Sequence, residues 1–116
     1  MPDVTAEEWQ LLSFFEVEPS MRDCDVPWCY NDALYEVSQG ELSLSFALKP
    51  AYHDVRLVLR LHGEILYELH TTDVKDVKYQ KDNGREQLTI EVNEHEAVEL
   101  CIKPRIEIRH CVEQRL

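Results

Sequence analysis

The sequence has no long apolar run and only three glycines. None of its apolar stretches approaches the length of about 20 residues that a membrane-spanning helix requires. Residues 1–8 carry neither the basic nor the apolar region of a secretion signal, so we expect a cytoplasmic protein with no membrane partner. The glycines fall in expected hairpin turns, which leaves none for a phosphate-cradling loop and predicts no nucleotide cofactor.

Basic residues are also scarce. The 116 residues include 23 Asp and Glu against 12 Lys and Arg, which gives a formal net charge of −11 at pH 7. DNA and RNA are not expected partners, because nucleic-acid binding needs a surface rich in Lys and Arg. A chain of this length is predicted to form a single domain, residues 1–116, whose core needs neither a disulfide nor a metal.

The cysteines show no spacing typical of a metal site. Cys24 and Cys29, with four intervening residues, lie at the edge of the range that structural zinc sites use, and Cys101 and Cys111, with nine, lie outside it. The sequence also contains no EF-hand loop and no serine nucleophile elbow. We therefore expect free thiols, no metal, no cofactor and no enzymatic activity.

A short helix is predicted near the N-terminus. Thr5 and Glu8 have the spacing of a capping box, and apolar residues crowd positions 9–15, so we expect a helix over residues 6–15 that packs closely on a sheet. Pro19 prevents the helix from continuing. Residues 16–32 show no sustained period and are expected to form an irregular connection.

Apolar and polar residues alternate from residue 33 onward, which is typical of β-strands. The fold class is therefore α+β, mainly β, with the N-terminal helix packed on an antiparallel meander of about eight strands over residues 33–112. A strongly curved sheet and a small barrel both fit this strand count. The expected cross-strand pairs are Tyr35 with Leu44, Val37 with Leu42, Leu59 with Tyr67, Leu61 with Ile65, Val77 with Ile90, Tyr79 with Leu88, and Lys81 with Glu86.

Acidic charge is concentrated in the first third of the chain. Residues 1–48 contain ten Asp and Glu but a single basic residue, Arg22. Within this part, residues 23–32 combine acidic and large aromatic side chains, which resembles the anchor-and-rim composition of a binding hot spot. The alternative is a well-solvated acidic surface on which the aromatic residues only fold the connection onto the sheet.

The composition favours a non-enzymatic interaction module that binds a basic protein partner. The expected binding residues are Asp23, Asp25, Trp28, Tyr30 and Asp32. Small acidic inhibitors of basic nucleases, of the bacterial immunity or antitoxin kind, use such a charge balance; this analogy concerns electrostatics and implies no relatedness. The last predicted strand, with Arg105, Glu107 and Arg109 on its outer face, is an edge that could also pair with its copy in a homodimer.

The alternative function is a small carrier of an apolar ligand. In this hypothesis the inner face forms a pocket whose few polar groups are Tyr35, Tyr67, Tyr79 and His110. His110 is expected on the inner face, where one of these tyrosine hydroxyls would have to satisfy it. No carboxylate is expected on that face, which favours a core histidine over a general base.

Overall fold

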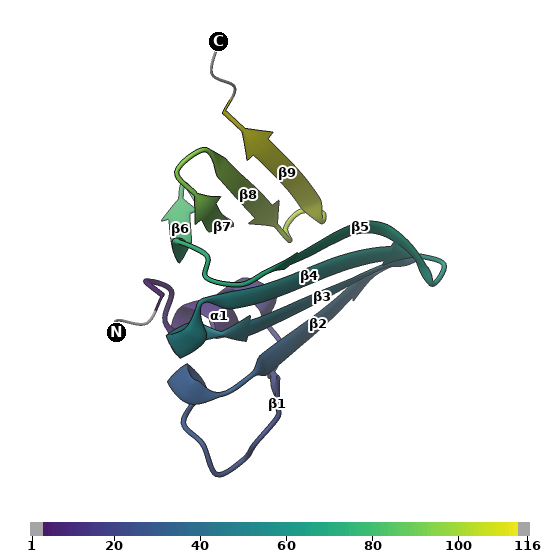
Figure 1. Ribbon diagram of the computed structural model, residues 1–116. Helices are drawn as coiled ribbons and strands as arrows, with labels where there is room; N and C mark the ends of the chain where they lie inside the picture. Colours follow the sequence, from purple (N-terminus) through teal and green to yellow (C-terminus); the bar gives the residue numbers. More distant parts are fainter. Residues whose placement is uncertain (1–3, 114–116) are drawn as a thin grey trace.

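The computed structural model describes residues 4–113, in which one α-helix and nine β-strands occur (Figure 1). The helix α1 spans Glu8–Phe15. The strands are β1 (Ser20–Met21), β2 (Ala33–Gln39), β3 (Leu42–Lys49), β4 (Asp54–Leu61), β5 (Glu64–Thr71), β6 (Asp76–Asp82), β7 (Arg85–Asn93), β8 (Glu96–Cys101) and β9 (Glu107–Val112). Two 3-10 helices, η1 (Trp28–Tyr30) and η2 (Pro50–Tyr52), precede β2 and β4.

The strands form two antiparallel sheets, with the order β1-β2-β3-β4-β5 in the first and β6-β7-β8-β9 in the second. The mainly β fold with one helix is therefore confirmed, and β2–β9 correspond to the eight expected strands. The barrel alternative is wrong. Among residues 4–113, β5 does not pair with β6, and neither sheet closes on itself. The connection expected to be irregular contains the short strand β1, which pairs with β2.

The helix α1 begins two residues later than predicted. Its N-cap is Glu7, whose side chain accepts a backbone hydrogen bond from Gln10, while the Gln10 side chain accepts one from the Glu7 amide at 2.8 Å. The predicted capping box starting at Thr5 is therefore wrong. The helix ends at Phe15, because Glu16 adopts the left-handed conformation with φ 58°.

The hairpin between β6 and β7 has the predicted register. Asn83 and Gly84 both have positive φ values, 52° and 80°, as the expected two-residue turn requires. The confirmed pairs are Val77 with Ile90, Tyr79 with Leu88, and Lys81 with Glu86.

The register predicted for the β2–β3 hairpin is wrong by two residues. The turn consists of Gly40 and Glu41 rather than Gln39 and Gly40, and only Gly40 has a positive φ, 58°. This matches a turn that needs glycine at its first central position. Because the shift is even, the inner face stays apolar. The observed pairs are Val37 with Leu44 and Tyr35 with Phe46.

The β4–β5 hairpin is confirmed in part. Leu59 pairs with Tyr67 as predicted, but Leu61 pairs with Glu64 instead of Ile65. The turn is one residue shorter than expected, because His62 and Gly63 both adopt positive φ. An irregularity in the ladder after Leu59 absorbs the difference.

A single hydrophobic core lies between the two sheets and α1. Figure 1 shows α1 behind the first sheet, and its side chains Leu11, Phe14 and Phe15 are buried. Phe15 stacks on Tyr35 of β2 and Phe46 of β3, with ring centroids 4.9 and 5.3 Å away. The expected packing of the helix on a sheet is confirmed, and its aromatic rings fill the space between the layers.

Hydrogen bonds to the Asp76 carboxylate hold the segment before α1 against β6. The Thr5 amide and hydroxyl donate to its carboxylate at 2.7 and 2.5 Å, and the Val77 amide donates at 2.8 Å. Burial alone would raise the pKa of Asp76, but these hydrogen bonds outweigh it and hold the pKa below its usual value. The folded state therefore favours the ionised carboxylate.

We expect Asp76→Asn to lower the free energy of unfolding by about 1–2 kcal/mol at pH 7, because the amide cannot replace a charged acceptor of several hydrogen bonds. The Asp76 contribution is complete above the ordinary carboxyl pKa of about 4 and is lost as the pH falls through the lower folded-state pKa. Thermal unfolding of the parent protein and of Asp76→Asn, at pH 7 and at about pH 2.5, measures how the stability difference between them changes with pH. An equal difference at both pH values would contradict it.

Candidate partner-binding surface

The connection between β1 and β2 is irregular but well fixed. Asn31, which is 3% exposed, donates through Nδ2 to the carbonyl oxygens of Asp23 and Val26 at 2.5 and 3.0 Å. Its Oδ1 accepts from the amides of Asp23 and Asp32 at 3.2 and 2.9 Å. One buried amide side chain thus holds both ends of this turn, so the acidic and aromatic residues on it are presented in one conformation.

Trp28, one of the expected binding residues, contacts the core. Its indole Nε1 donates to the Tyr35 hydroxyl at 3.0 Å, and its ring packs partly buried against the hydrophobic core. Burial is the largest influence on the Tyr35 hydroxyl and raises its pKa to about 12. The hydrogen bond from Trp28 lowers this pKa, and the nearby charge of Glu8 raises it. Trp28 therefore attaches the connection to β2.

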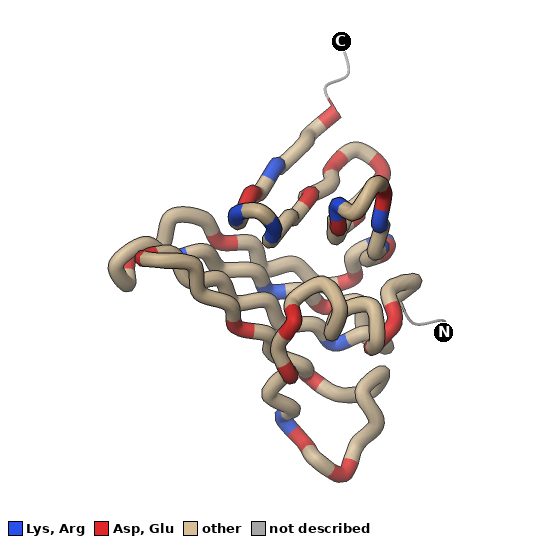
Figure 2. Tube along the Cα trace, turned by 180° about the vertical axis from the view of Figure 1, so that it is seen from behind, with Lys and Arg blue, Asp and Glu red and all other residues tan. Residues whose placement is uncertain are grey.

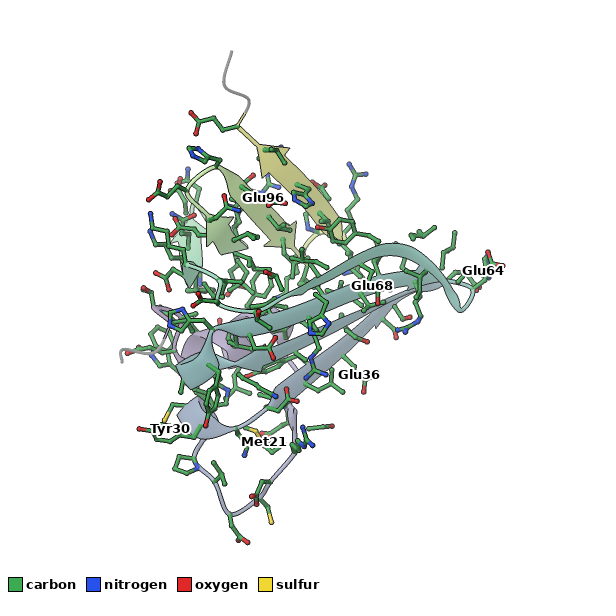
Figure 3. The ribbon with its side chains drawn as sticks, in the orientation of Figure 1. Met21, Tyr30, Glu36, Glu64, Glu68 and Glu96 are labelled. Carbon is green, nitrogen blue, oxygen red and sulfur yellow. The ribbon has the colours of Figure 1, made fainter. Side chains whose placement is uncertain are left out.

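Tyr30 is exposed and lines a shallow surface hollow of about 470 Å³. It projects outward at the edge of the molecule in Figure 3. Tyr52 of η2 lines the same hollow, and the two side chains are 59% and 64% exposed. Asp23 and Asp32 also border it. Tyr52 was not among the expected residues, because its place beside Tyr30 depends on contact between η1 and η2, which are far apart in the sequence.

The three expected aspartates differ in their surroundings. Asp32 accepts two hydrogen bonds from Nη2 of Arg56, at 2.6 and 2.5 Å, and its side chain is 12% exposed. Asp23 and Asp25 are exposed, and no Lys or Arg between residues 4 and 113 forms an ion pair with them. The charge of Asp32 is thus neutralised within the fold, whereas Asp23 and Asp25 form no such ion pair among the described residues. Arg22 and Lys49 also border the hollow, so its rim is not purely acidic.

Asp23, Cys24 and Asp25 are the residues in this connection that could hold a metal. Their ligand atoms lie within 4.8 Å of one another, but all three side chains are exposed. Exposed acidic groups are common without an ion, and a cation site usually recruits more oxygen ligands than these. All four cysteines, Cys24, Cys29, Cys101 and Cys111, are free, as predicted.

The acidic residues of the first third do not form one patch. Glu7 and Glu8 lie at the start of α1, Asp23 and Asp25 lie on the connection, and Glu36 lies on β2 (Figures 2 and 3). In Figure 3, Glu36 lies along the first sheet with Glu64 and Glu68, away from the connection. The acidic charge therefore reaches the surface in several separate places.

The four residues expected to line a ligand pocket do not form one site, because Tyr67 and His110 contact each other while Tyr35 and Tyr79 have other partners. Tyr35 binds Trp28, and Tyr79 donates to Glu86 at 2.5 Å beside α1. Phe15 stacks on Tyr35, and Phe14 contacts the Tyr79 ring edge at a centroid distance of 6.4 Å. The helix side chains thus occupy the space between the sheets that the carrier hypothesis assigned to a ligand.

His110 lies between the two sheets near their open edge, and its side chain is 31% exposed. Its Nδ1 is 2.9 Å from the Tyr67 hydroxyl, so the expected tyrosine partner is confirmed. The expectation that no carboxylate faces it is wrong, because Nε2 is 2.5 Å from Oε2 of Glu96. Glu96 is the first residue of β8, and β8 pairs with β9, the strand that carries His110. Burial, and secondly the charge of Glu96, raise the pKa of Tyr67.

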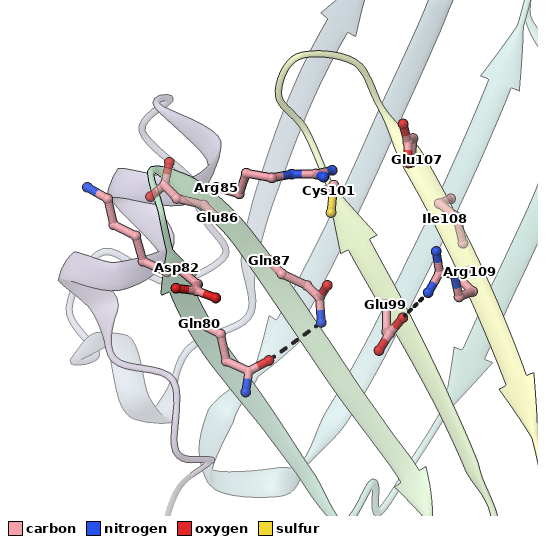
Figure 4. A pocket seen from close by; sticks show the side chains of 11 residues that line it. Gln80, Asp82, Arg85, Glu86, Gln87, Glu99, Cys101, Glu107, Ile108 and Arg109 are labelled. Carbon is pink, nitrogen blue, oxygen red and sulfur yellow. Dashed lines mark hydrogen bonds and ion pairs between the residues drawn. The ribbon is translucent and has the colours of Figure 1, made fainter.

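A second hollow of about 860 Å³ lies over the outer face of the β6–β9 sheet (Figure 4). Its polar side chains largely pair with one another. Arg109 contacts Glu99 at 3.4 Å, and Gln87 donates to Gln80 at 3.5 Å. Burial raises the pKa of the Cys101 thiol in this hollow, so the reactive thiolate is disfavoured. The lining carries four acidic and three basic side chains, so its charges nearly balance.

These features define a small, mainly β fold with one helix and two open antiparallel sheets. Several of its acidic and aromatic side chains lie on the connection between β1 and β2. No helix between residues 4 and 113 is long and apolar enough to cross a membrane.

Comparison with known proteins gives one structural match. No protein-family model and no curated protein matches the chain. Among solved structures, the chain is similar to one in the "Contact-dependent growth inhibition toxin - immunity protein complex from Klebsiella pneumoniae 342", with a TM-score of 0.76 and 25% sequence identity. The alignment covers 90% of this chain and 92% of that chain, so the likeness extends over nearly the whole domain.

Proposed function

We propose that this chain is a non-enzymatic, immunity-like module that binds and restrains a basic protein. The structural likeness to a chain of a toxin–immunity complex carries this proposal, because it spans almost the full length of both chains. The net charge of −11 supports a basic partner, since complementary potentials speed association and select against wrong partners.

We propose that the partner binds through one surface, which we call the connection surface. It consists of Asp23, Asp25, Tyr30 and Tyr52. The two exposed tyrosines supply apolar contact area. The two aspartates supply exposed charge that forms no ion pair with a Lys or Arg of residues 4–113, although Arg22 and Lys49 border the same hollow. Trp28 and Asp32 act on this surface indirectly. They attach the connection to Tyr35 and Arg56 and so fix its shape before the partner arrives.

A cytoplasmic location and a homodimer through β9 remain predictions. The β9 edge carries ion pairs within this chain, Arg105 with Glu107 and Arg109 with Glu99, at 3.0 and 3.4 Å. These pairs leave fewer free charges for contact with a second copy.

The function is tested by recovering the partner and measuring protection. The tagged chain is used at low salt to capture its partner from native lysate, and the captured protein is expressed in a laboratory bacterium with and without this chain. We expect a basic protein that arrests growth when expressed alone, and growth restored to near the uninduced rate on co-expression. A captured protein that is not toxic, or toxicity that co-expression leaves unchanged, would overturn the proposal.

A further inference from the structure

The two sheets have four edge strands, β1, β5, β6 and β9, and three of these edges are poor templates for another strand. The β6 edge already accepts a backbone hydrogen bond, from the Ala6 amide to the Val77 carbonyl oxygen at 2.8 Å. The β1 edge is two residues long. The β9 edge carries Glu107 and Arg109, so a strand of either charge would meet a repelling side chain. The edge that remains is β5.

The strand β5 is long and paired on one side only. Its ladder with β4 runs from Val55 and Thr71 to Leu61 and Glu64 (Figure 1). Among residues 4–113, no other strand pairs with β5, and no turn or loop forms a backbone-to-backbone hydrogen bond with it. Five of its eight side chains are exposed. Alternate residues of an edge strand direct their amide and carbonyl groups away from the sheet, so β5 presents a row of unpaired backbone donors and acceptors.

The inner side of β5 is held in place. The Tyr67 hydroxyl is 2.9 Å from Nδ1 of His110 on β9, and Leu69 packs against the hydrophobic core. His110 is in turn held by Glu96 of β8, at 2.5 Å from Nε2. A strand that is already extended and fixed loses little conformational freedom when another strand pairs with it.

The charged side chains of β5 favour a basic strand over a second copy of this chain. The strand contains Glu64 and Glu68 but no Lys, Arg or Pro, the residues that most often protect an edge. On the neighbouring β4, Asp32 binds Arg56, which leaves Arg60 as its one basic side chain without an ion pair among residues 4–113. A second copy would bring two more glutamates to this edge, whereas Lys or Arg on an added strand would be attracted.

The apolar side chains of β5 are exposed on both faces of the sheet. Ile65 and Leu66 are 52% and 57% exposed, and successive residues of a strand point to opposite faces. An added strand would cover both side chains with its own, since cross-strand neighbours pack against one another.

We propose that the β5 edge binds an extended, basic segment of the partner as a sixth strand of the first sheet. This inference rests on the proposed function for the basic character of the partner, and it adds a second surface to the connection surface. Backbone hydrogen bonds hold the segment, and the side chains of β5 select it. Loss of a single glutamate therefore costs little. The connection lies at the opposite border of this sheet, about 19 Å or four strand spacings away, a distance that a small protein can span.

The edge can be probed without the natural partner. We expect the blocked peptide Lys-Val-Lys-Val-Lys-Val to slow hydrogen exchange of the outward-facing β5 amides about tenfold, as measured by NMR. The control is the same peptide with every backbone nitrogen methylated, which keeps the charges and side chains but cannot donate hydrogen bonds, and it should give no protection. Equal protection by both peptides, or none at β5 with either, would overturn the inference. Protection that instead rises with the concentration of the protein alone would assign the edge to a second copy and overturn it as well.

The captured partner provides the second measurement. We expect Leu66→Lys to weaken partner binding about tenfold, because it places a basic side chain on the edge. The matched control is Val112→Lys on β9, which adds the same charge at a residue that is 61% exposed and should weaken binding by less than about twofold. Unfolding temperatures should stay close to that of the parent protein, because both residues are exposed.

The two proposals fail in different ways. If the partner is toxic and co-expression protects growth, but Leu66→Lys binds it as tightly as Val112→Lys does, this inference fails while the proposed function stands. If no toxic partner is found but the unmethylated peptide protects β5 as described, the strand-binding edge stands and the proposed function fails.

Discussion

Phe15→Ala is expected to lower the free energy of unfolding by about 3–5 kcal/mol, the range seen when a buried phenylalanine is truncated. Phe15 is 2% exposed and contacts both Tyr35 and Phe46 of the first sheet through stacked rings. It also meets Phe14 edge-on at a centroid distance of 4.9 Å. Removing this ring opens a cavity where α1 joins the sheet, and it removes aromatic contacts that add to simple burial. Denaturant titration measures the loss.

The control for Phe15 is Tyr52→Ala. Tyr52 is also aromatic but is 64% exposed, so its removal should change stability by less than about 0.5 kcal/mol. Phe15→Leu keeps most of the apolar volume and should lose about 1–2 kcal/mol, which provides a folded intermediate case if the alanine variant is too unstable to purify. Equal effects of Phe15→Ala and Tyr52→Ala would show that α1 does not close the core.

The strands were predictable from the sequence because one physical pattern determines them. Apolar residues alternate with polar ones from Ala33 to Val112, and this pattern together with the turn residues placed β2–β9. Most of the alternating apolar residues face the core, although Ile65 and Val112 are exposed. Turn register was less predictable. His62 accepts a positive φ of 53°, which shortens the β4–β5 turn, and no composition rule singles out a histidine for that conformation. The sequence also did not predict the division into two sheets, because the break after β5 depends on how the two sheets and α1 pack on one another.

The candidate site was predictable only in part, because exposure is a property of the folded chain. The sequence showed that acidic and aromatic residues alternate near Trp28, but it could not show which tryptophan the core would accept. The structure buries part of Trp28 through its bond to Tyr35 and leaves Trp9 exposed. Likewise, the ion pair between Asp32 and Arg56 joins residues 24 positions apart, so the neutralisation of this acid carries no local sequence signal.

Asp32 is paired with Arg56, whereas Asp23 and Asp25 are exposed, and this difference predicts which aspartates affect the rate of association with a basic partner. Asp23→Asn/Asp25→Asn is expected to slow association with the basic partner about tenfold at low salt, because these two exposed charges contribute to the long-range attraction. Added salt screens such charges over roughly 8–10 Å, so the parent rate should fall steeply with ionic strength and the variant rate much less. Stopped-flow fluorescence across a salt series measures both rates.

Two variants separate this effect from a general loss of charge. Glu36→Gln/Glu68→Gln removes the same formal charge from the first sheet, away from the connection (Figure 3), and should slow association only about twofold. Asp32→Asn removes a carboxylate that Arg56 already neutralises. It should therefore lower stability, because Arg56 loses its partner, and it should slow association less than Asp23→Asn/Asp25→Asn does, because it changes one charge instead of two. If all three variants slow association equally, the partner responds to net charge, and the connection surface has no special part in binding.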